Sequence, residues 1–538
     1  MTPDAQADLL LRAIATTARE DGAELDRLDA VTGDGDFGST LARGARALLA
    51  DPPAGDVAAV LRAASERMAA AMGGSSGAFV GVGLLRAARA LEDAPADGPL
   101  EATVIGAAVR AGADGITEYG GARPGDKTLI DALDPVAAAL EAGEPGRAVD
   151  AAREGAEATG EMAARVGRSS YAGERSKGAP DAGATAVAAI VRRLAAGELP
   201  TWEDLRERAP EAAAEDDEET PQHGFVNDPD HLVDEALDGL VAAHPDLLRR
   251  LEDHPVALRA GGLATGRVAL VSGGGAGHEP LHASFVGEGM LDAACPGAIF
   301  TSPSSAQIAA AARAVGSDAG VLFVVKRYTG DLMNFRLAAE LLQADGVETQ
   351  TVVVADDVAI DADAATGRRG TGATVAVERI AGAAAARGDA LEAVRQIGER
   401  VAAAGRSFGV ALHGDQMELG VGIHGEPGRP REPVVPADEL AVRLLEPLVA
   451  ELAPDPSAPL LLQLSGLGGT PPLELHVLFR GLVAALEREH GLTPARVLVG
   501  DLVTSLTQPG AIATLVTLDD ETLALWDAPL RTPALRWG

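Results

Sequence analysis

RVALVSGGGAGHEPLH (residues 267–282) is the stretch that decides the fold of the second half of this chain. Its first six residues form a mostly apolar run of the length of a buried strand, and glycines and His278 follow. We interpret it as a strand that runs into a glycine-rich turn, where open α/β sheets usually bind their ligands. It is not a G-x-G-x-x-G motif, because His278 stands at the last glycine position.

The same stretch also spells H-E-x-x-H from His278 to His282. A zinc hydrolase needs both histidines on one face of a helix. Pro280 inside the motif and the glycines before it disfavour a position within a helix. The sequence therefore favours His278 as an acid or base at a strand end over a zinc ligand.

Further apolar runs of strand length follow His282, with alanine-rich helical patterns between many of them, such as 305–315 and 374–387. This alternation predicts an α/β region, which we divide into subdomains at 223–405 and 406–538. The strands are expected in VLFVV (321–325), TVVVA (351–355), FGVAL (408–412), LLLQL (460–464), RVLVG (496–500) and IATLVTL (512–518).

The first half of the chain has a different pattern. Residues 1–200 repeat apolar side chains at helical spacing, as in Val60, Leu61, Ala64 and Met68, and show no strand-like run. An all-α domain is predicted there. Residues 201–222 are strongly acidic, and we interpret them as a solvated linker between the two halves.

Composition excludes several classes of protein. The 538 residues carry a net charge of −35, which repels nucleic acid and anionic membranes but still allows phosphate binding by backbone N–H groups or metal ions. Cys295 is the single cysteine, so an internal disulfide framework is excluded. The N-terminus has no basic region before its short apolar stretch, and no run reaches the roughly 18 apolar residues of a membrane span. We expect a soluble cytoplasmic protein.

LDAVTGDGDFGST (28–40) is the main metal-site candidate of the first half. Asp29, Asp34 and Asp36 alternate with glycines that allow tight turns, so their carboxylates can converge. Carboxylates without His or Cys suit Mg²⁺, although a helix-capping turn would look similar. The spacing is not that of an EF-hand, because Ser39 stands at the position of its invariant glycine.

Two more glycine-rich stretches lie in the first half. MGGSSGAF (72–79) precedes an apolar helix, so its N–H groups and hydroxyls could cradle a phosphate or simply begin the helix. GARPGDKT (121–128) imitates a P-loop, but Asp126 falls where lysine is needed and no strand precedes it. A P-loop fold is excluded.

Two motifs complete the second half. VVKRYTGD (324–331) delivers Lys326 and Asp331 after a buried strand, as a binding pair or as a surface ion pair. GVGIHGEPG (420–428) flanks His424 with glycines that let a ligand approach closely, although a turn histidine would fit as well.

Together these motifs resemble the dihydroxyacetone kinase family over nearly the whole chain. The first half resembles its nucleotide-binding domain, an α-helical barrel, and residues 223–535 resemble its ketone-binding domain. The motifs occur in family order: LDAVTGDGDFGST, MGGSSG, ARPGDKT and GRSSYAGERSKGAPDAGAT (167–185), then SGGGAGHEP, FTSPS (300–304), VVKRYTGD, GRRG (367–370), MELGVGIHGEPG and GLGGTP (466–471).

The resemblance implies ATP-dependent phosphorylation of dihydroxyacetone or a related short-chain ketose. His424 would hold the ketone as a covalent hemiaminal, and His278 and Asp331 would act on the hydroxyl that receives phosphate. It further implies a homodimer joined through the ketone-binding domains. The remaining implied contacts are Gly275, Ala276, Gly277 and Lys326 for the substrate; Asp29, Asp34 and Asp36 for two Mg²⁺ ions; and Ser39, Thr40, Gly74, Ser75, Ser76, Gly77, Arg168, Asp181 and Gly183 for the nucleotide.

The chain departs from the family pattern in three ways. The nucleotide domain comes first, the reverse of the commoner fused order. A family segment of some 15 residues before MELG is missing in ALHGDQMELG (411–420). Ala276, Arg327 and Ser465 replace Ser, Asn and Asn, and TSLTQPG (504–510) replaces TSLDMAG. The missing segment and the replaced residues all lie in the ketone half, so the identity of the ketone stays open, and a four-carbon ketose such as erythrulose is one candidate.

Three other functions stay open at this point. The fold could take phosphate from a phosphotransferase protein and keep ADP as a cofactor, although the fusion of both domains favours free ATP. It could be a non-catalytic ketone-binding regulator, although such a protein should lose part of the Asp triad or the histidines. A lyase reaction on FAD occurs in some relatives.

Overall fold

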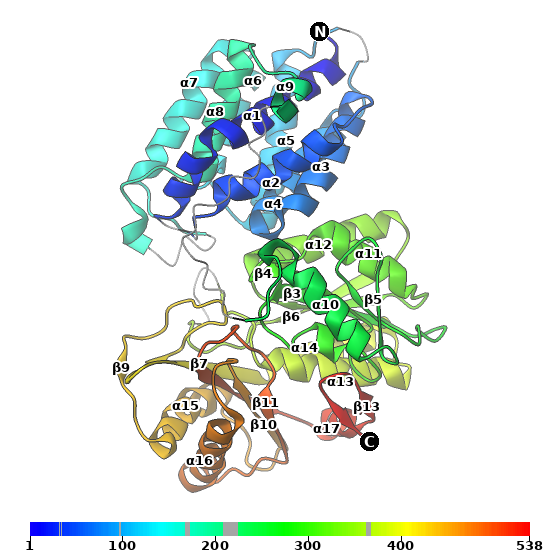
Figure 1. Ribbon diagram of the computed structural model, residues 1–538, viewed down its shortest axis with the longest axis vertical. Coiled ribbons are helices and arrows are strands. Elements are labelled where there is room, and N and C mark those ends of the chain that lie inside the picture. Colours follow the sequence, from blue (N-terminus) through cyan, green and yellow to red (C-terminus); the bar gives the residue numbers. More distant parts are fainter. Residues whose placement is uncertain (32, 34, 96–97, 167–172, 208–223, 362–366) are drawn as a thin grey trace. The chain divides into compact units, whose positions relative to one another are not determined.

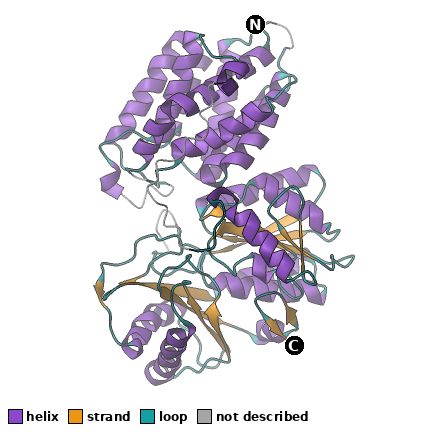
Figure 2. Cartoon of the chain, viewed as in Figure 1, coloured by secondary structure: helices purple, strands orange, loops and turns teal. Residues whose placement is uncertain are grey.

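The structure is a computed structural model that describes residues 1–538 except 32, 34, 96–97, 167–172, 208–223 and 362–366. The chain forms two compact units, Met1–Phe225 and Val226–Gly538. Figure 2 shows only helices and loops in the first unit and both strands and helices in the second. No helix in these described ranges combines the length and the apolar character that a bilayer crossing requires.

The N-terminal unit is a closed ring of helices. Each of α1 to α7 packs against the next helix, and α8 packs back against α1, which confirms the predicted helical barrel. Apolar side chains at helical spacing, such as Leu11, Leu25 and Met68, fill its interior. The helices are α1 (Pro3–Asp29), α2 (Phe37–Ala50), α3 (Val57–Met72), α4 (Gly74–Ala90), α5 (Ala102–Gly120), α6 (Ile130–Glu141), α7 (Pro145–Ala158), η1 (Thr159–Glu161), α8 (Ala182–Ala196) and α9 (Trp202–Glu207).

The start of the predicted linker belongs to the N-terminal unit. Residues 202–207 form α9, in which Leu205 is buried in the helical core. The Trp202 indole donates a hydrogen bond to Asp8 on α1 at 2.7 Å. The acidic composition of 201–222 concealed this short amphipathic turn. The rest of the predicted linker, from residue 208 on, lies outside the described residues.

The first sheet of the C-terminal unit has the strand order β1-β2-β4-β3-β5-β6. β4, β3, β5 and β6 run parallel, whereas β1 and β2 pair antiparallel at one edge. Its strands and associated helices are η3 (Pro229–His231), α10 (Leu232–Ala243), β1 (Leu248–Arg250), β2 (Ala257–Arg259), β3 (Ala269–Ala276), η4 (Ala283–Phe285), β4 (Ala293–Ile299), α11 (Ser305–Val315), β5 (Val321–Lys326), α12 (Thr329–Ala344), β6 (Thr349–Val354) and α14 (Leu391–Ala403).

The second sheet has the order β11-β10-β12-β7-β8-β9 and is mostly antiparallel, with β10 and β11 parallel. α15 and α16 pack on this sheet, and they lie side by side in Figure 1. Its elements and the C-terminal ones are β7 (Gly405–His413), β8 (Gln416–Leu419), β9 (Glu432–Pro433), α15 (Ala437–Leu452), β10 (Leu460–Gly466), α16 (Pro472–His490), β11 (Arg496–Asp501), β12 (Gly510–Thr517), α17 (Asp520–Asp527), β13 (Leu530–Arg531) and β14 (Arg536–Trp537).

Helix α13 (Ala373–Arg387) lies between the two sheets. It contacts β3 and β5 of the first sheet and β7 and β12 of the second, and its residues 373–385 are all buried. One continuous apolar core therefore joins both sheets around this helix. α13 also carries two buried charged residues, Glu378 and Arg379, in the middle of its alanine-rich sequence.

The glycine run of the opening motif corrects the sequence interpretation. β3 continues through Gly273, Gly274 and Gly275 to Ala276, and the turn begins only at Gly277. β3 is a central strand between β4 and β5, and a Cβ on Gly273 would lie 2.5 Å from the carbonyl oxygen of Cys295 on β4. The glycines are needed here for close approach between backbones, not for turning.

Candidate active site

The predicted ketone-binding residues come together from three chain segments of the C-terminal unit. His278 follows β3, Lys326 ends β5 with Asp331 in the first turn of α12, and His424 lies in the loop after β8. The His278 and His424 rings are 4.8 Å apart between centroids, and the Tyr328 ring is 4.4 Å from that of His424. The carboxyl ends of two parallel strands thus face a loop of the second sheet.

His424 is held in one defined orientation. Its Nδ1 lies 3.1 Å from Oε1 of Glu426, and its backbone N–H donates to Oε2 of the same carboxylate at 2.9 Å. A carboxylate can only accept, so the ring proton resides on Nδ1 and the Nε2 lone pair is left for other chemistry. The side chain is 19% exposed, which leaves it accessible to a small ligand.

Glu426 is strongly ionised in this arrangement. Burial by itself raises the pKa of its carboxyl, but the hydrogen bond from His424 and the charge of Arg369 outweigh burial and bring the pKa down to about 2. The Arg369 guanidinium lies 3.8 Å from Glu426 and 2.6 Å from Asp357. A buried arginine therefore fixes the carboxylate that orients His424.

His278 is buried and neutral. Its Nδ1–H donates to the Thr504 carbonyl oxygen at 2.8 Å, a contact between residues 226 positions apart. Burial first, and then the charges of His424 and Lys326, lower its pKa well below the usual value of 6.5. Among the residues that the structure describes, none lies within hydrogen-bonding distance of its Nε2. His278 thus presents a free base nitrogen next to His424.

Lys326 and Asp331 form the charged part of the site. Both side chains are almost fully buried, and Nζ of Lys326 lies 3.6 Å from Oδ2 of Asp331. Nζ also lies 2.9 Å from Nε2 of His282, the second histidine of the H-E-x-x-H spelling. The alternative of a surface ion pair is wrong, because neither side chain reaches the surface.

The glycine stretch shapes the wall of this site. A Cβ on Gly275 would lie 2.6 Å from the backbone of Phe300, so only glycine fits there. The N–H of Gly277 donates to the Glu279 carboxylate at 2.9 Å, and Gly277 has a positive φ of 99°. Ala276 is buried, and its carbonyl accepts from the Phe300 N–H.

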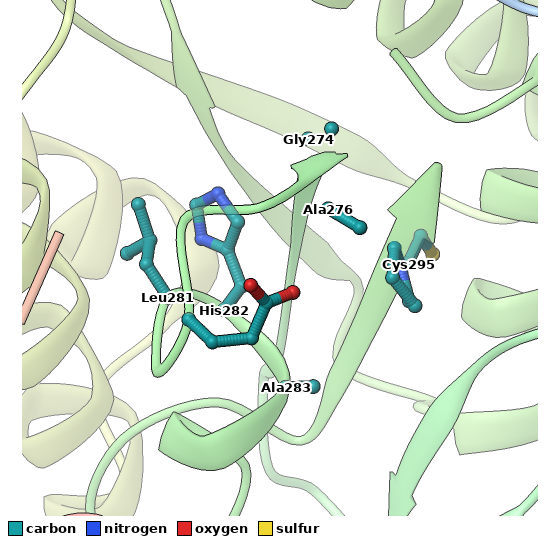
Figure 3. A pocket seen from close by; sticks show the side chains of 9 residues that line it. Gly274, Ala276, Leu281, His282, Ala283 and Cys295 are labelled. Carbon is teal, nitrogen blue, oxygen red and sulfur yellow. The ribbon is translucent and has the colours of Figure 1, made fainter. Parts of the chain in front are cut away.

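A small cavity lies behind this wall (Figure 3). It is lined by Gly274, Ala276, His282 and Cys295 among others, and measures about 10 Å³. That is room for about one water molecule and not for a ketose. This cavity is therefore not a ketose site, and burial raises the pKa of the Cys295 thiol that lines it.

The predicted metal ligands lie in the N-terminal unit. Asp29 ends α1, and its Oδ2 accepts hydrogen bonds from the N–H groups of Gly35 at 2.9 Å and Asp36 at 3.2 Å. A Cβ on Gly33 would collide with the Asp29 carboxylate, so a side chain there would displace that carboxylate. Asp34 lies outside the described residues. Within those that are described, no group of three or more His, Cys, Asp or Glu side chains forms a metal cage.

Charge around Asp29 nevertheless fits a hard cation. Burial first, together with the charges of Asp131 and Asp29, raises the pKa of Asp181 to about 6, although the N–H of Ala184 and the charge of Lys127 lower it. The charges of Asp131 and Asp29 thus disfavour the ionised form of Asp181. Oxygen donors of this kind suit Mg²⁺, and a bound cation would relieve the repulsion.

The predicted nucleotide contacts divide between two places. Gly74, Ser75, Ser76 and Gly77 form the first turn of α4. The Gly77 N–H donates to the Gly73 carbonyl at 2.9 Å, so phosphate binding here would rely on the N–H groups nearer the start of the turn, such as those of Ser75 and Ser76. Ser39 and Thr40 begin α2. The Ser39 hydroxyl donates to Asp26 at 2.8 Å, and the Thr40 hydroxyl donates to Asp36 at 3.2 Å.

The other predicted nucleotide residues lie at α8. The Asp181 side chain caps this helix by accepting from the Ala184 N–H at 2.8 Å, and Gly183 packs against Leu129. Both positions therefore have a structural role of their own. Arg168 lies outside the described residues.

Sequence reasoning missed several residues of the ketone site. Glu426 stands two positions after His424 in the quoted motif, and its spacing to a glycine-flanked histidine could have indicated an orienting carboxylate. Arg369 lies in GRRG, which the sequence analysis used only as a family marker. Glu378 gave no signal, because it sits in an alanine-rich helix that looks wholly structural.

Comparisons with known proteins give matches for both units. A Dak1 domain model matches residues 238–534, and a DAK2 domain model matches residues 31–196. The dihydroxyacetone-binding subunit of the PEP-dependent dihydroxyacetone kinase of Escherichia coli K12 is 41% identical over 355 residues, which cover 58% of this chain and 99% of that protein.

Two further similarities involve proteins of which the match covers little more than half. The triokinase/FMN cyclase of Bos taurus is 40% identical over 335 residues, which cover 58% of this chain and 57% of that protein. The crystal structure of the dihydroxyacetone kinase from C. freundii in complex with AMP-PNP and Mg²⁺ matches with a TM-score of 0.54 and 33% identity. It covers 58% of this chain and 60% of that one.

Proposed function

The chain belongs to the dihydroxyacetone kinase family, and from that premise we propose that it phosphorylates dihydroxyacetone or a closely related short-chain ketose with ATP. The observation that carries this proposal is the pair formed by His424 and Glu426. It presents a free Nε2 beside the neutral base His278 and the buried pair Lys326 and Asp331. A nucleophile, a base and a cation are the groups that ketone capture and hydroxyl activation need.

Ketone capture begins at His424. Its Nε2 lone pair adds to the carbonyl carbon, a C–N bond forms, and the carbonyl π electrons move to oxygen. Positive charge develops on the ring, which keeps its Nδ1 proton, and the ionised Glu426 stabilises that charge while it accepts the Nδ1–H. The oxygen gains a proton, for which Lys326 is the proposed donor. The resulting hemiaminal fixes the ketose and selects carbonyl substrates over polyols.

Phosphoryl transfer needs a positioned hydroxyl more than it needs covalent chemistry. We assign removal of the hydroxyl proton to Asp331 and His278, because both can accept one: the His278 Nε2 is unprotonated and unpartnered among the described residues. Gly275, Ala276 and Gly277 shape the wall beside it.

On the nucleotide side, we assign Asp29, Asp34 and Asp36 to hold two Mg²⁺ ions, which would neutralise charge on the phosphates. The carboxylate repulsion around Asp29 supports this assignment. In the first turn of α4, the N–H groups of Ser75 and Ser76 would donate to phosphate oxygens, and Gly74 and Gly77 would flank the phosphates. Ser39, Thr40, Arg168, Asp181 and Gly183 complete the proposed nucleotide pocket.

The phosphoryl donor is tested with purified protein and MgATP as the only phosphate source. ADP release is coupled to NADH oxidation across dihydroxyacetone, glyceraldehyde and glycerol. Ketose-dependent ADP release supports ATP as the donor. No release with MgATP, but turnover after a phosphotransferase system is added, would replace ATP by a phosphoprotein donor. No turnover in either assay would indicate a ketone-binding regulator.

One observation favours a wider substrate range. Where relatives carry the extra segment before Met417, this chain turns in two residues, Gly414 and Asp415, between the paired residues His413 and Gln416. A segment that is absent cannot close over the substrate. We therefore propose that erythrulose, with one more carbon, is also phosphorylated. The kcat/KM of both erythrulose enantiomers is compared with that of dihydroxyacetone, and a preference for dihydroxyacetone above about a hundredfold refutes the open pocket.

We also propose a homodimer through the ketone-binding domains, with phosphoryl transfer between chains. The nucleotide residues and the ketone residues lie in different compact units, so either unit alone is incomplete. Mixing a His424→Ala chain with an Asp36→Asn chain should restore activity if transfer occurs between subunits. An inactive mixture after verified subunit exchange would show transfer within one chain.

A further inference from the structure

A buried chain of hydrogen bonds runs from helix α13 to the candidate active site. Oε1 of Glu378 lies 2.6 Å from Nδ1 of His282, and Nε2 of His282 lies 2.9 Å from Nζ of Lys326. All three side chains are almost completely buried. The function proposed above uses Lys326 but leaves Glu378 and His282 without a role.

If Lys326 is charged, the donors and acceptors of these three side chains allow only one arrangement of hydrogen bonds. An ammonium group only donates, so Nε2 of His282 must accept and its proton must be on Nδ1. Ser272 supports this tautomer: its hydroxyl donates to the Val324 carbonyl at 2.7 Å, so its lone pair faces Nδ1–H of His282 at 3.0 Å. Burial, followed by the charge of Lys326, lowers the pKa of His282 well below 6.5, which keeps the ring neutral.

Burying the Glu378 carboxyl costs free energy of desolvation, and packing alone does not explain why it is there. It lies in the buried middle of an otherwise mostly apolar helix, and burial raises its pKa to about 8. The neighbouring Arg379 is not its partner, because that guanidinium donates to the carbonyl oxygens of Gly289 and Trp526. Oε2 of Glu378 has no hydrogen-bond partner among the described residues. Only Oε1 is engaged, and it faces His282.

The strand opposite leaves space for the lysine head. A Cβ on Gly274 would collide with Nζ of Lys326 and would lie 3.4 Å from Nε2 of His282. Any side chain at the middle glycine of SGGGAG would therefore push the lysine head away from its place beside the histidine. Gly274 on β3, Glu378 on α13 and His282 of the H-E-x-x-H motif thus all surround the contact between His282 and Lys326.

We propose that Glu378 and His282 are positioning residues that hold the Lys326 ammonium for the ketose. One N–H of Lys326 is committed to His282 and one side of the ammonium faces Asp331, which leaves a single direction for the substrate oxygen. This inference rests on the proposed role of Lys326 in ketose binding.

Variants of Glu378 and His282 distinguish a positioning role from a role in packing. Glu378→Gln keeps an oxygen that accepts from His282 but cannot ionise, whereas Glu378→Leu combined with Ser272→Ala removes both acceptors. His282→Leu removes the link itself. Thr374→Val is the matched control: Thr374 is equally buried on α13, and its hydroxyl has no hydrogen-bond partner in the described part of the chain.

The kinetic readout is KM for the ketose against KM for MgATP. His282→Leu and the double variant should raise the ketose KM about tenfold or more and leave the MgATP KM unchanged. Glu378→Gln should stay within about threefold of the wild type but lose any titration near pH 8 from the pH profile of kcat/KM. A ketose KM that His282→Leu leaves unchanged, or that Thr374→Val raises equally, overturns the proposal.

A second measurement is made on the wild-type protein and does not depend on turnover. Long-range ¹H–¹⁵N spectra of the wild-type protein with labelled histidine, assigned with His282→Leu, report which ring nitrogen carries the proton. The expected result is a proton on Nδ1 of His282, and a proton on Nε2 overturns the positioning role. If the wild type turns over no ketose, the proposed function fails, while this measurement still decides the tautomer.

Discussion

Replacing Glu426 tests whether this carboxylate sets the orientation and the tautomer of His424 for attack on the ketone. In the structure this carboxylate accepts from both the Nδ1 and the backbone N–H of His424. Glu426→Ala removes the acceptor, so the ring can turn or move its proton to Nε2, the atom that must attack the ketone. Glu426→Gln keeps an accepting oxygen but loses the charge that stabilises the ring when it becomes positive.

The structure sets the size of the effect. The pKa of Glu426 falls from the ordinary 4.5 to about 2, because His424 and Arg369 outweigh burial. A shift of that size corresponds to roughly 3 kcal/mol of preference for the ionised form, at about 1.4 kcal/mol per unit. His424 supplies only part of it. Glu426→Ala should therefore lower kcat/KM for the ketose by between about tenfold and about 150-fold, and Glu426→Gln by about tenfold or less.

The pH dependence has a defined sign. A lowered carboxyl pKa means that the stabilisation is fully present above the unfolded value near 4.5 and is lost as the pH falls toward about 2. Glu426 stays ionised throughout the working range of an enzyme. The ratio of wild-type to Glu426→Ala activity should then be constant from about pH 6 to about pH 8.

The assay follows the ketone carbon directly. In ¹³C NMR, [2-¹³C]dihydroxyacetone bound as a hemiaminal gives a saturated-carbon signal in place of the carbonyl signal. Free hydrated dihydroxyacetone also gives a saturated-carbon signal, and the spectrum with His424→Ala measures that background. Glu432→Gln is the control: it removes a carboxylate on the adjoining strand β9 that pairs with Arg443. Wild-type hemiaminal signal and kcat/KM within about threefold of wild type in Glu426→Ala would refute the reasoning.

Three other predictions follow from the site geometry. His424→Ala should abolish the hemiaminal signal and ketose turnover, and unchanged turnover would exclude covalent capture. Asp29→Asn and Asp36→Asn should raise the Mg²⁺ concentration needed for ATP use on the order of tenfold or more while ketose binding by calorimetry persists; wild-type activity at low Mg²⁺ would make the metal assignment wrong. Because the pKa of Asp181 is raised to about 6, the folded state binds more protons than the unfolded state from 3.8 upward, so Asp181 destabilises the fold as pH rises through that window. Asp181→Asn keeps the helix cap and should gain roughly 3 kcal/mol over the wild type between about pH 4 and about pH 7 in urea unfolding without Mg²⁺; an equal difference at both ends would contradict this.

The sequence by itself determined the elements and their classes. Apolar side chains at helical spacing gave the barrel helices, and the runs 321–325 and 408–412 lie within β5 and β7, because local periodicity records which face of an element is buried. β4 was missed, since Pro296 and Gly297 interrupt its sequence. The pairing of Val271 with Ala293 makes it a strand, and such a pairing leaves no local pattern.

The sequence also identified the chemical groups, because the motifs around His278, Lys326 and His424 resemble a known family. Their geometry came only from the tertiary structure. The Thr504 carbonyl that fixes the His278 tautomer lies 226 positions away, and Arg369, which holds Glu426, was visible only as part of a marker. Glu378 was the least visible of all, because a helix that is buried on every side shows no periodicity from which a partner can be inferred. The glycines of β3 were interpreted as a turn, since a glycine that turns and a glycine that admits a close neighbour look alike until the neighbour is known. Local sequence thus encodes which face of an element is buried, whereas the protonation and orientation of the site depend on contacts between distant segments that only folding brings together.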